Sequence, residues 1–154
     1  MGFVVEQVTS GVTWRLRQQV LRPHQAVAEM ALSGDDDPGG AHFAAYHLSG
    51  SGEVDEVIGV ASVLAQDEPD RSLTGCAWRL RGMATAPQAR RLGVGAALLE
   101  RVVAHVVSCG GALLWANARV GALPFYRAHG FSVASSTFDV PHTGGHVRVH
   151  RPVS

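Results

Sequence analysis

Lysine is absent from this 154-residue sequence, so all 13 of its basic residues are arginine. A phosphate-binding P-loop needs a lysine after its second glycine, so that class of nucleotide-binding protein is excluded. Cysteine is scarce: Cys76 and Cys109 lie far apart outside any Cys-x-x-Cys pair, which favours reduced thiols over a disulfide framework. Long apolar runs are also lacking, because stretches such as residues 57–61 fall far short of the roughly 18 residues that span a bilayer. We therefore expect no membrane span.

The size and composition are those of a globular protein. The chain has a mass of 16.3 kDa, with 46% apolar and 17% charged residues, as is usual for one compact domain. We predict a single domain over residues 1–154. The first residues, Met-Gly-Phe-Val-Val-Glu, lack the basic region of a secretory signal, so we expect a cytoplasmic location.

Charge is distributed unevenly although the net charge is zero. Residues 1–75 hold eleven acids and four arginines, whereas residues 76–154 hold nine arginines and two acids. Four arginines without an intervening acid, at positions 79, 81, 90 and 91, create a local positive field. The second half is therefore expected to meet an anion, although a solvated arginine face would have the same composition.

Hydrophobic periodicity and turn residues predict alternating strands and helices. Residues 88–108 carry Val94, Leu98, Val102 and Val106 at four-residue spacing, which indicates an amphipathic helix. The expected order is β, α, β, β, β, α, β, α, β, β, which predicts a mixed sheet covered by helices. The predicted elements are strand 3–9, helix 12–30 with a break at Pro23, a hairpin of strands 41–48 and 56–65, loop 66–74, strand 76–85, helix 88–108, strand 113–116, helix 122–129, and strands 131–139 and 146–149.

The segment 80–99 carries the strongest chemical signal. A strand leads through a glycine-bearing turn into a helix, which directs free backbone N–H groups and the positive end of the helix dipole at one point. The dinucleotide-binding fingerprint fails here, since Leu98 stands where its third glycine belongs. An Arg-x-x-Gly-x-Gly pattern remains, formed by Arg90, Gly93 and Gly95. A glycine pair that only packs a helix closely on a sheet is the alternative.

With a second motif downstream, the sequence resembles the GNAT superfamily of acetyl-CoA-dependent N-acetyltransferases. Residues 114–131, Leu-Trp-Ala-Asn-Ala-Arg-Val-Gly-Ala-Leu-Pro-Phe-Tyr-Arg-Ala-His-Gly-Phe, are similar to that family's second signature. Residues from about 55 to 142 match well, most closely a branch of small stand-alone bacterial members. The resemblance implies an α/β (α+β) fold, a mixed, mostly antiparallel twisted sheet of about seven strands flanked by about four helices. It further implies an acceptor side within about 1–75 and an acetyl-CoA-binding half within about 76–154.

The resemblance also implies the residues that bind acetyl-CoA. Backbone N–H groups from Arg91 to Ala96 would hold the pyrophosphate, and the strand around Met83 would pair with pantetheine like an added strand. Arg91 replaces the first glycine of the family's common loop, which affects the fine geometry of the loop. The implied cofactor-binding residues are Met83, Ala84, Thr85, Arg90, Arg91, Leu92, Gly93, Val94, Gly95, Ala96, Asn117 and Tyr126.

The implied reaction is direct transfer of an acetyl group to a primary amine of a small molecule, or of a peptide or protein, in a ternary complex. Tyr126 matches the family's general acid, which would protonate the departing thiolate. Backbone N–H groups near Met83 would stabilise the tetrahedral oxyanion. A purely packing role for Tyr126 is the alternative at that residue. A catalytically quiet acyl-CoA-binding sensor or interaction module on the same fold is the alternative for the whole chain.

The sequence does not identify the general base. His42 and His142 are candidates, and Glu53, Asp55 or Glu56 could act through water. The histidines at 142, 146 and 150 recur every four residues, but on a strand that spacing separates side chains by about 13 Å, so no metal site is expected.

The expected partner is a small-molecule amine, and a second copy of the chain is the other partner considered. Nucleic acid is not expected, because the arginines lack interleaved aromatic residues. Arg79 and Arg81 alternate with Trp78 and Leu80, so one sheet face carries positive charge that suits a carboxylate or phosphate on the acceptor or cofactor. Whether another acyl-CoA replaces acetyl-CoA is left open.

Overall fold

The computed structural model describes residues 2–71 and 76–154. Residues 72–74 of the predicted loop 66–74 lie outside the described residues. No helix in the described ranges is long and apolar enough to cross a membrane. The regular elements are β1 (Phe3–Val8), α1 (Ser10–Leu16), a π-helical turn (Arg17–Leu21), a 3₁₀ turn (Val27–Met30), β2 (Ala41–Leu48), β3 (Val54–Ala65), β4 (Ala77–Thr85), a 3₁₀ turn (Pro87–Ala89), α2 (Val94–Ser108), β5 (Leu113–Arg119), a 3₁₀ turn (Val120–Ala122), α3 (Leu123–Ala128), β6 (Ser132–Val133), β7 (Phe138–Val140) and β8 (Gly144–Pro152).

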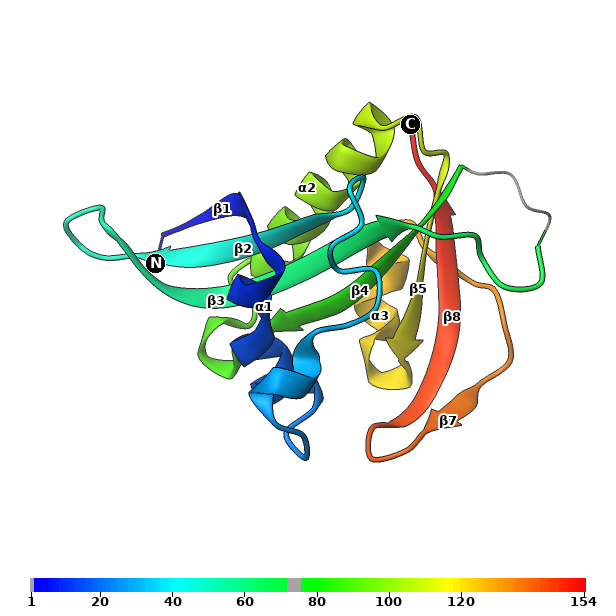
Figure 1. Ribbon diagram of the computed structural model, residues 1–154, viewed down its shortest axis with the longest axis horizontal. Coiled ribbons are helices and arrows are strands. Elements are labelled where there is room, and N and C mark those ends of the chain that lie inside the picture. The colour runs from blue at the N-terminus through cyan, green and yellow to red at the C-terminus, as the bar shows by residue number, and fades with distance from the viewer. Residues whose placement is uncertain (1, 72–75) are drawn as a thin grey trace.

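The strands form one sheet in the order β1-β2-β3-β4-β5-β8-β6, and β7 pairs with β8 (Figure 1). The β4–β5 pair is parallel, because α2 connects these strands as a crossover, and the other pairs are antiparallel. The predicted mixed, mostly antiparallel sheet is confirmed. It contains eight strands where about seven were expected.

Helices cover both faces of the sheet, with α1 and the π-helical turn on one side and α2 and α3 on the other (Figure 1). The predicted apolar stripe of α2 is buried, and Leu98, Val102 and Val106 are fully excluded from solvent. Strand alternation gives β4 two different faces. Trp78 and Leu80 lie in the core with α2, whereas Arg81 faces the N-terminal segment and donates a hydrogen bond to Asp35.

Three predicted elements differ most from the structure. The predicted helix 88–108 begins only at Val94, because residues 90–93 form a loop in which Arg91 and Gly93 take positive φ angles. The predicted helix 12–30 is divided into α1, a π-helical turn and a 3₁₀ turn. The predicted strand 131–139 is two short strands, β6 and β7, each paired with β8.

A bulge in β4 shapes the centre of the sheet. Val60 pairs with Ala84 and Ser62 with Arg81, so two β4 residues, Gly82 and Met83, oppose a single residue of β3. A bulge of this kind leaves an extra residue outside the ladder and bends its strand. Gly82 has a φ of 62°, a left-handed conformation that glycine adopts at little cost.

Candidate active site

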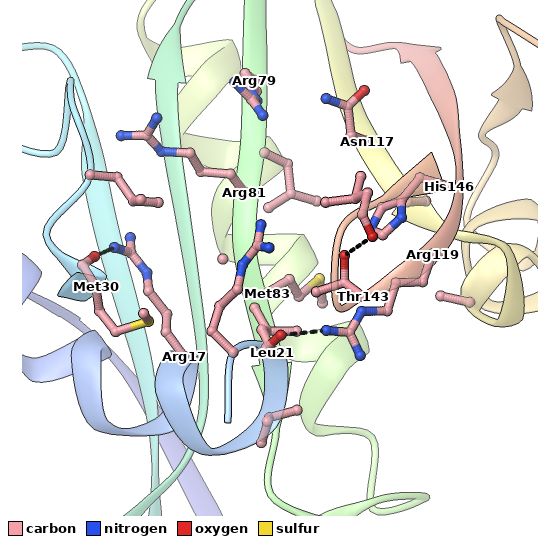
Figure 2. A pocket seen from close by; sticks show the side chains of 18 of the residues that line it. Arg17, Leu21, Met30, Arg79, Arg81, Met83, Asn117, Arg119, Thr143 and His146 are labelled. Carbon is pink, nitrogen blue, oxygen red and sulfur yellow. Dashed lines mark hydrogen bonds between the residues drawn. The ribbon is translucent and has the colours of Figure 1, made fainter. Parts of the chain in front are cut away.

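The cavity lies where β4 and β5 separate. These strands pair over only three positions, from Ala77 opposite Leu113 to Arg79 opposite Trp115. Beyond Arg79, the β4 edge that faces β5 has no strand partner in the described chain. A cavity of about 690 Å³ occupies this region (Figure 2), which is within the usual range for small-molecule sites.

The cavity brings together residues from both halves of the sequence. Met83, Asn117, Tyr126 and Arg90, all predicted to bind the cofactor, line it. The π-helical and 3₁₀ turns of the N-terminal half form the opposite wall, which includes Leu21 and Met30 (Figure 2). Ala84 and Thr85 continue β4 past the cavity towards the loop that precedes α2.

The N-terminus of α2 presents backbone donors that no side chain occupies. Gly93 is the N-cap residue with a φ of 83°, and no side chain forms a capping hydrogen bond there. Arg90, Arg91, Leu92 and Gly93 are exposed. The first N–H groups of a helix have no partner within the helix, so this turn offers several donors and the positive end of a 15-residue helix to an anion.

Arg91 stands where the family that the sequence resembles has glycine. The φ angle of Arg91 is 69°. Left-handed backbone is uncommon for an arginine and costs on the order of 1 kcal/mol. The loop therefore retains a glycine-like conformation without the glycine.

Gly95 has a packing role beside the loop. A Cβ at this position would lie 3.3 Å from Cε1 of Phe125 and 3.6 Å from Cε of Met83. Gly95 therefore has the close-packing role that is the alternative to binding an anion. A Cβ on Gly93 would meet nothing within 4 Å, so this role does not apply to Gly93.

Tyr126 is buried between two aromatic rings at the cavity wall. The residue is 7% exposed, and the centre of its ring lies 5.4 Å from that of Phe125 and 5.1 Å from that of Phe131 in edge-on contacts. Burial raises the pKa of Tyr126 to about 12. Its hydroxyl forms no hydrogen bond with the described residues. Because Tyr126 lines the cavity, this unpaired hydroxyl is available to a ligand there.

The sequence-based candidates for the base lie outside the cavity lining. His42 is buried, and its two ring nitrogens contact the Ser62 hydroxyl at 2.6 Å and the Asp35 carbonyl at 2.7 Å. His142 is exposed and stacks on His24 with ring centroids 4.6 Å apart. Glu53, Asp55 and Glu56 are exposed in and beside the β2–β3 turn.

His146 lines the cavity, which sequence reasoning missed. Its Nδ1 lies 2.9 Å from the Gly144 carbonyl oxygen. A carbonyl only accepts, so Nδ1 carries the proton and the neutral ring keeps a lone pair on Nε2. The one signal in the sequence was the four-residue histidine repeat. Among residues 2–71 and 76–154, no three His, Cys, Asp or Glu side chains form a group that could hold a metal ion.

The cavity is strongly cationic. None of its lining residues is an aspartate or glutamate in the described chain. Asp35, beneath the wall, accepts from Arg17 at 2.8 Å and from Arg81 at 2.9 Å. Burial alone would raise the pKa of Asp35, but hydrogen bonds from Arg17 and the Leu32 N–H and the charge of Arg17 outweigh it, so this pKa is lowered. The arginines that line the cavity are Arg17, Arg22, Arg79, Arg81, Arg90 and Arg119.

Comparison with known proteins defines the class. The profile of the acetyltransferase (GNAT) domain matches residues 38–133, and the chain belongs to this family of acyltransferases, whose members use acetyl-CoA. The uncharacterized N-acetyltransferase YitI of Bacillus subtilis is 28% identical over 148 residues, covering 96% of this chain and 94% of YitI.

Solved structures share the fold. An IAA acetyltransferase from Bacillus cereus superposes with a TM-score of 0.72 at 17% identity, covering 99% of this chain and 100% of that one. An acetyltransferase of the GNAT family from Staphylococcus aureus gives 0.68 at 14% identity, with 99% and 100% coverage. An aminoglycoside 6'-N-acetyltransferase complexed with coenzyme A gives 0.67 at 12% identity, with 98% and 97% coverage.

Proposed function

We propose that the chain transfers an acetyl group from acetyl-CoA to a primary amine of a small molecule, by direct attack of the amine in a ternary complex. The observation that carries this proposal is the hydroxyl of the buried residue Tyr126, which lines the β4–β5 cavity without a hydrogen-bond partner among the described residues. A residue needed only for packing would gain nothing from an unpaired hydroxyl at a cavity wall.

Two features of the described backbone suit acetyl-CoA. The uncapped N-terminus of α2 suits a pyrophosphate, held by the N–H groups of residues 91–96 with Arg90 and Arg91 beside them. The free edge of β4 around Met83, Ala84 and Thr85 suits the amide groups of pantetheine. We assign Asn117, two residues past the last β5 position paired with β4, to the same ligand. The acetyl-CoA-binding half is thus about 76–154, and the acceptor side is about 1–75.

When bound, acetyl-CoA supplies a thioester as the electrophile. The bulge leaves Gly82 and Met83 without register partners in β3, and we assign the Met83 N–H to the negative charge that develops on the carbonyl oxygen. Tyr126 donates its proton to the departing sulfur. Because its pKa is about 12, the phenol stays protonated at neutral pH and holds a proton to give.

We assign the general base to His146. A neutral amine is the nucleophile, so a basic group in the cavity has to accept its proton during or before attack. His146 offers the Nε2 lone pair there, with its ring fixed by the Gly144 carbonyl and by a stacking contact with Phe138 at 5.9 Å. His42 has both ring nitrogens engaged, so it serves the structure of the N-terminal half instead.

Thiol release with a panel of primary amines tests the proposal. We expect acetyl-CoA to raise the melting temperature and CoA to be released only when an amine is present. Ligand at a hundred times its dissociation constant adds about 2.7 kcal/mol of stability. A catalytically quiet acyl-CoA-binding module would show the thermal shift with no amine-dependent release of thiol.

A further inference from the structure

The six arginines of the cavity differ in how their charge is balanced. Arg17 and Arg81 share Asp35. Arg119 donates to the Leu21 carbonyl at 2.6 Å. Arg22, Arg79 and Arg90 have neither a carboxylate nor a side-chain hydrogen-bond partner among the described residues, and of these three only Arg79 has a buried guanidinium nitrogen.

The surroundings of Arg79 make its lack of a partner costly. Its guanidinium lies 5.1 Å from the centre of the Trp115 ring, and its Nε is buried without an acceptor. Burial, and then the nearby charge of Arg81, lower the pKa of Arg79. A guanidinium remains charged even so, and a half-buried cation is stabilised by an anion that accepts its hydrogen bonds.

Arg79 is too far from the α2 loop to serve the pyrophosphate. It precedes Thr85 by six residues of β4, about 20 Å along an extended strand, and the α2 loop comes after Thr85. It shares a strand face with Arg81, which binds Asp35 of the N-terminal half. Figure 2 shows Arg79 and Asn117 at one end of the cavity and Met83 and Arg119 at the other.

We propose that the acceptor is a primary amine that also carries an oxyanion, a carboxylate or a phosphate, and that Arg79 binds this oxyanion in the cavity. The inference rests on the proposed acetyl transfer and names its substrate class. Arg79 lies four strand residues from Met83, at most about 13 Å because the bulge shortens this part of β4. The amine at the reacting end and the oxyanion at Arg79 are therefore separated by several bonds, as in an ω-amino acid, and not by the single carbon of an α-amino acid.

Matched amines test the charge and the separation. We expect 6-aminohexanoate to be acetylated with a kcat/KM at least tenfold above that of hexylamine, which has the same chain without the carboxylate. Glycine should be a poorer acceptor than 6-aminohexanoate. 6-Aminohexyl phosphate, assayed beside them, tells which oxyanion the cavity prefers. Equal rates for hexylamine and both anionic amines would overturn the inference.

Variants at Arg79 connect the preference to the residue. Arg79→Gln should raise the KM for 6-aminohexanoate at least tenfold and leave the KM for hexylamine unchanged, and Arg79→Lys should restore part of the affinity. Arg127→Gln removes the same charge from an exposed position of α3 and should change neither value. An unchanged preference in Arg79→Gln would overturn the assignment. If Arg79→Gln does not fold, Arg79→Lys and the wild-type amine series decide.

The same measurements distinguish failure of the oxyanion site from failure of acetyl transfer. If acetyl-CoA binds and hexylamine is acetylated as well as 6-aminohexanoate, the oxyanion site is wrong and acetyl transfer stands. If no amine is acetylated and acetyl-CoA gives no thermal shift, acetyl transfer itself is wrong. In that case a thermal shift with 6-aminohexanoate that Arg79→Gln abolishes would still support an oxyanion site, and its absence would overturn that site too.

Discussion

Gly82 leaves the space that the Arg17 guanidinium fills. A Cβ on Gly82 would lie 2.6 Å from Nε of Arg17 and 3.3 Å from its Cζ. Arg17 is 2% exposed, and it reaches past the bulge to Asp35, to the Ser62 hydroxyl at 2.8 Å and to the Met30 carbonyl at 2.8 Å. The β4 bulge therefore positions a cation that ties the N-terminal wall of the cavity to the sheet.

Gly82→Ala should lower the free energy of unfolding by roughly 2–4 kcal/mol. The methyl group displaces Arg17 from a buried ion pair, and the left-handed backbone adds about 1 kcal/mol of strain. Denaturant unfolding measures the change. Gly11→Ala is the control, because a Cβ there meets nothing within 4 Å and the position lies in α1, so its stability should stay the same or rise. Equal stability of the two variants would show that Arg17 does not depend on the glycine.

Stability should fall between about pH 10 and 12 because of Tyr126. The neutral phenol is favoured in the folded protein, where the pKa is about 12, whereas the unfolded chain ionises near 10.0. The stabilisation is complete below pH 10 and is lost as pH rises through 12, which amounts to roughly 2–3 kcal/mol. Tyr126→Phe should remove this part of the alkaline loss. Tyr46→Phe, at the only other tyrosine, should retain it.

Charge at the α2 N-terminus should control acetyl-CoA binding. Gly93→Asp and Gly93→Asn share the same positive φ and the same open space, so they differ mainly in one negative charge. The aspartate should repel the pyrophosphate and weaken acetyl-CoA binding at least tenfold more than the asparagine does. Isothermal titration with acetyl-CoA measures both. Equal affinities would place the pyrophosphate elsewhere.

His146→Ala should slow acetyl transfer roughly 10- to 100-fold with little change in acetyl-CoA affinity. Added imidazole should restore part of the rate, since it can take the place of the missing ring. His47→Gln, in the β2 strand outside the cavity lining, is the control and should behave like wild type. If the rate of acetyl transfer falls and imidazole does not restore it, His146 has a structural role and is not the base.

Local patterns in the sequence predicted most of the fold. The hairpin of β2 and β3 and the apolar stripe of α2 are confirmed, because both depend on residues close together in the chain. The early start predicted for α2 was wrong. Arg91 and Gly93 take positive φ angles in the loop before Val94, and hydrophobic periodicity does not report backbone angles. β5 extends to Arg119 because β8 pairs with it along its whole length.

The site was predictable only where a motif carried it. The two signatures placed Met83, Arg90, Asn117 and Tyr126, and the structure brings these residues to one cavity. The base was not predictable, because His146 enters the cavity through its pairing with Arg119, 27 positions earlier. Contacts between distant segments of this kind leave no periodic signal in a single sequence.

Transfer of labelled acetyl from acetyl-CoA to 6-aminohexanoate by wild type and Tyr126→Phe tests the central claim most directly. Phenylalanine keeps the ring contacts with Phe125 and Phe131 and removes only the hydroxyl group. The account predicts labelled product with wild type, a rate roughly 10²-fold lower with the variant, and the same acetyl-CoA affinity in both. Weaker acetyl-CoA binding with an unchanged rate of transfer, or no labelled product from wild type with any amine, would contradict it.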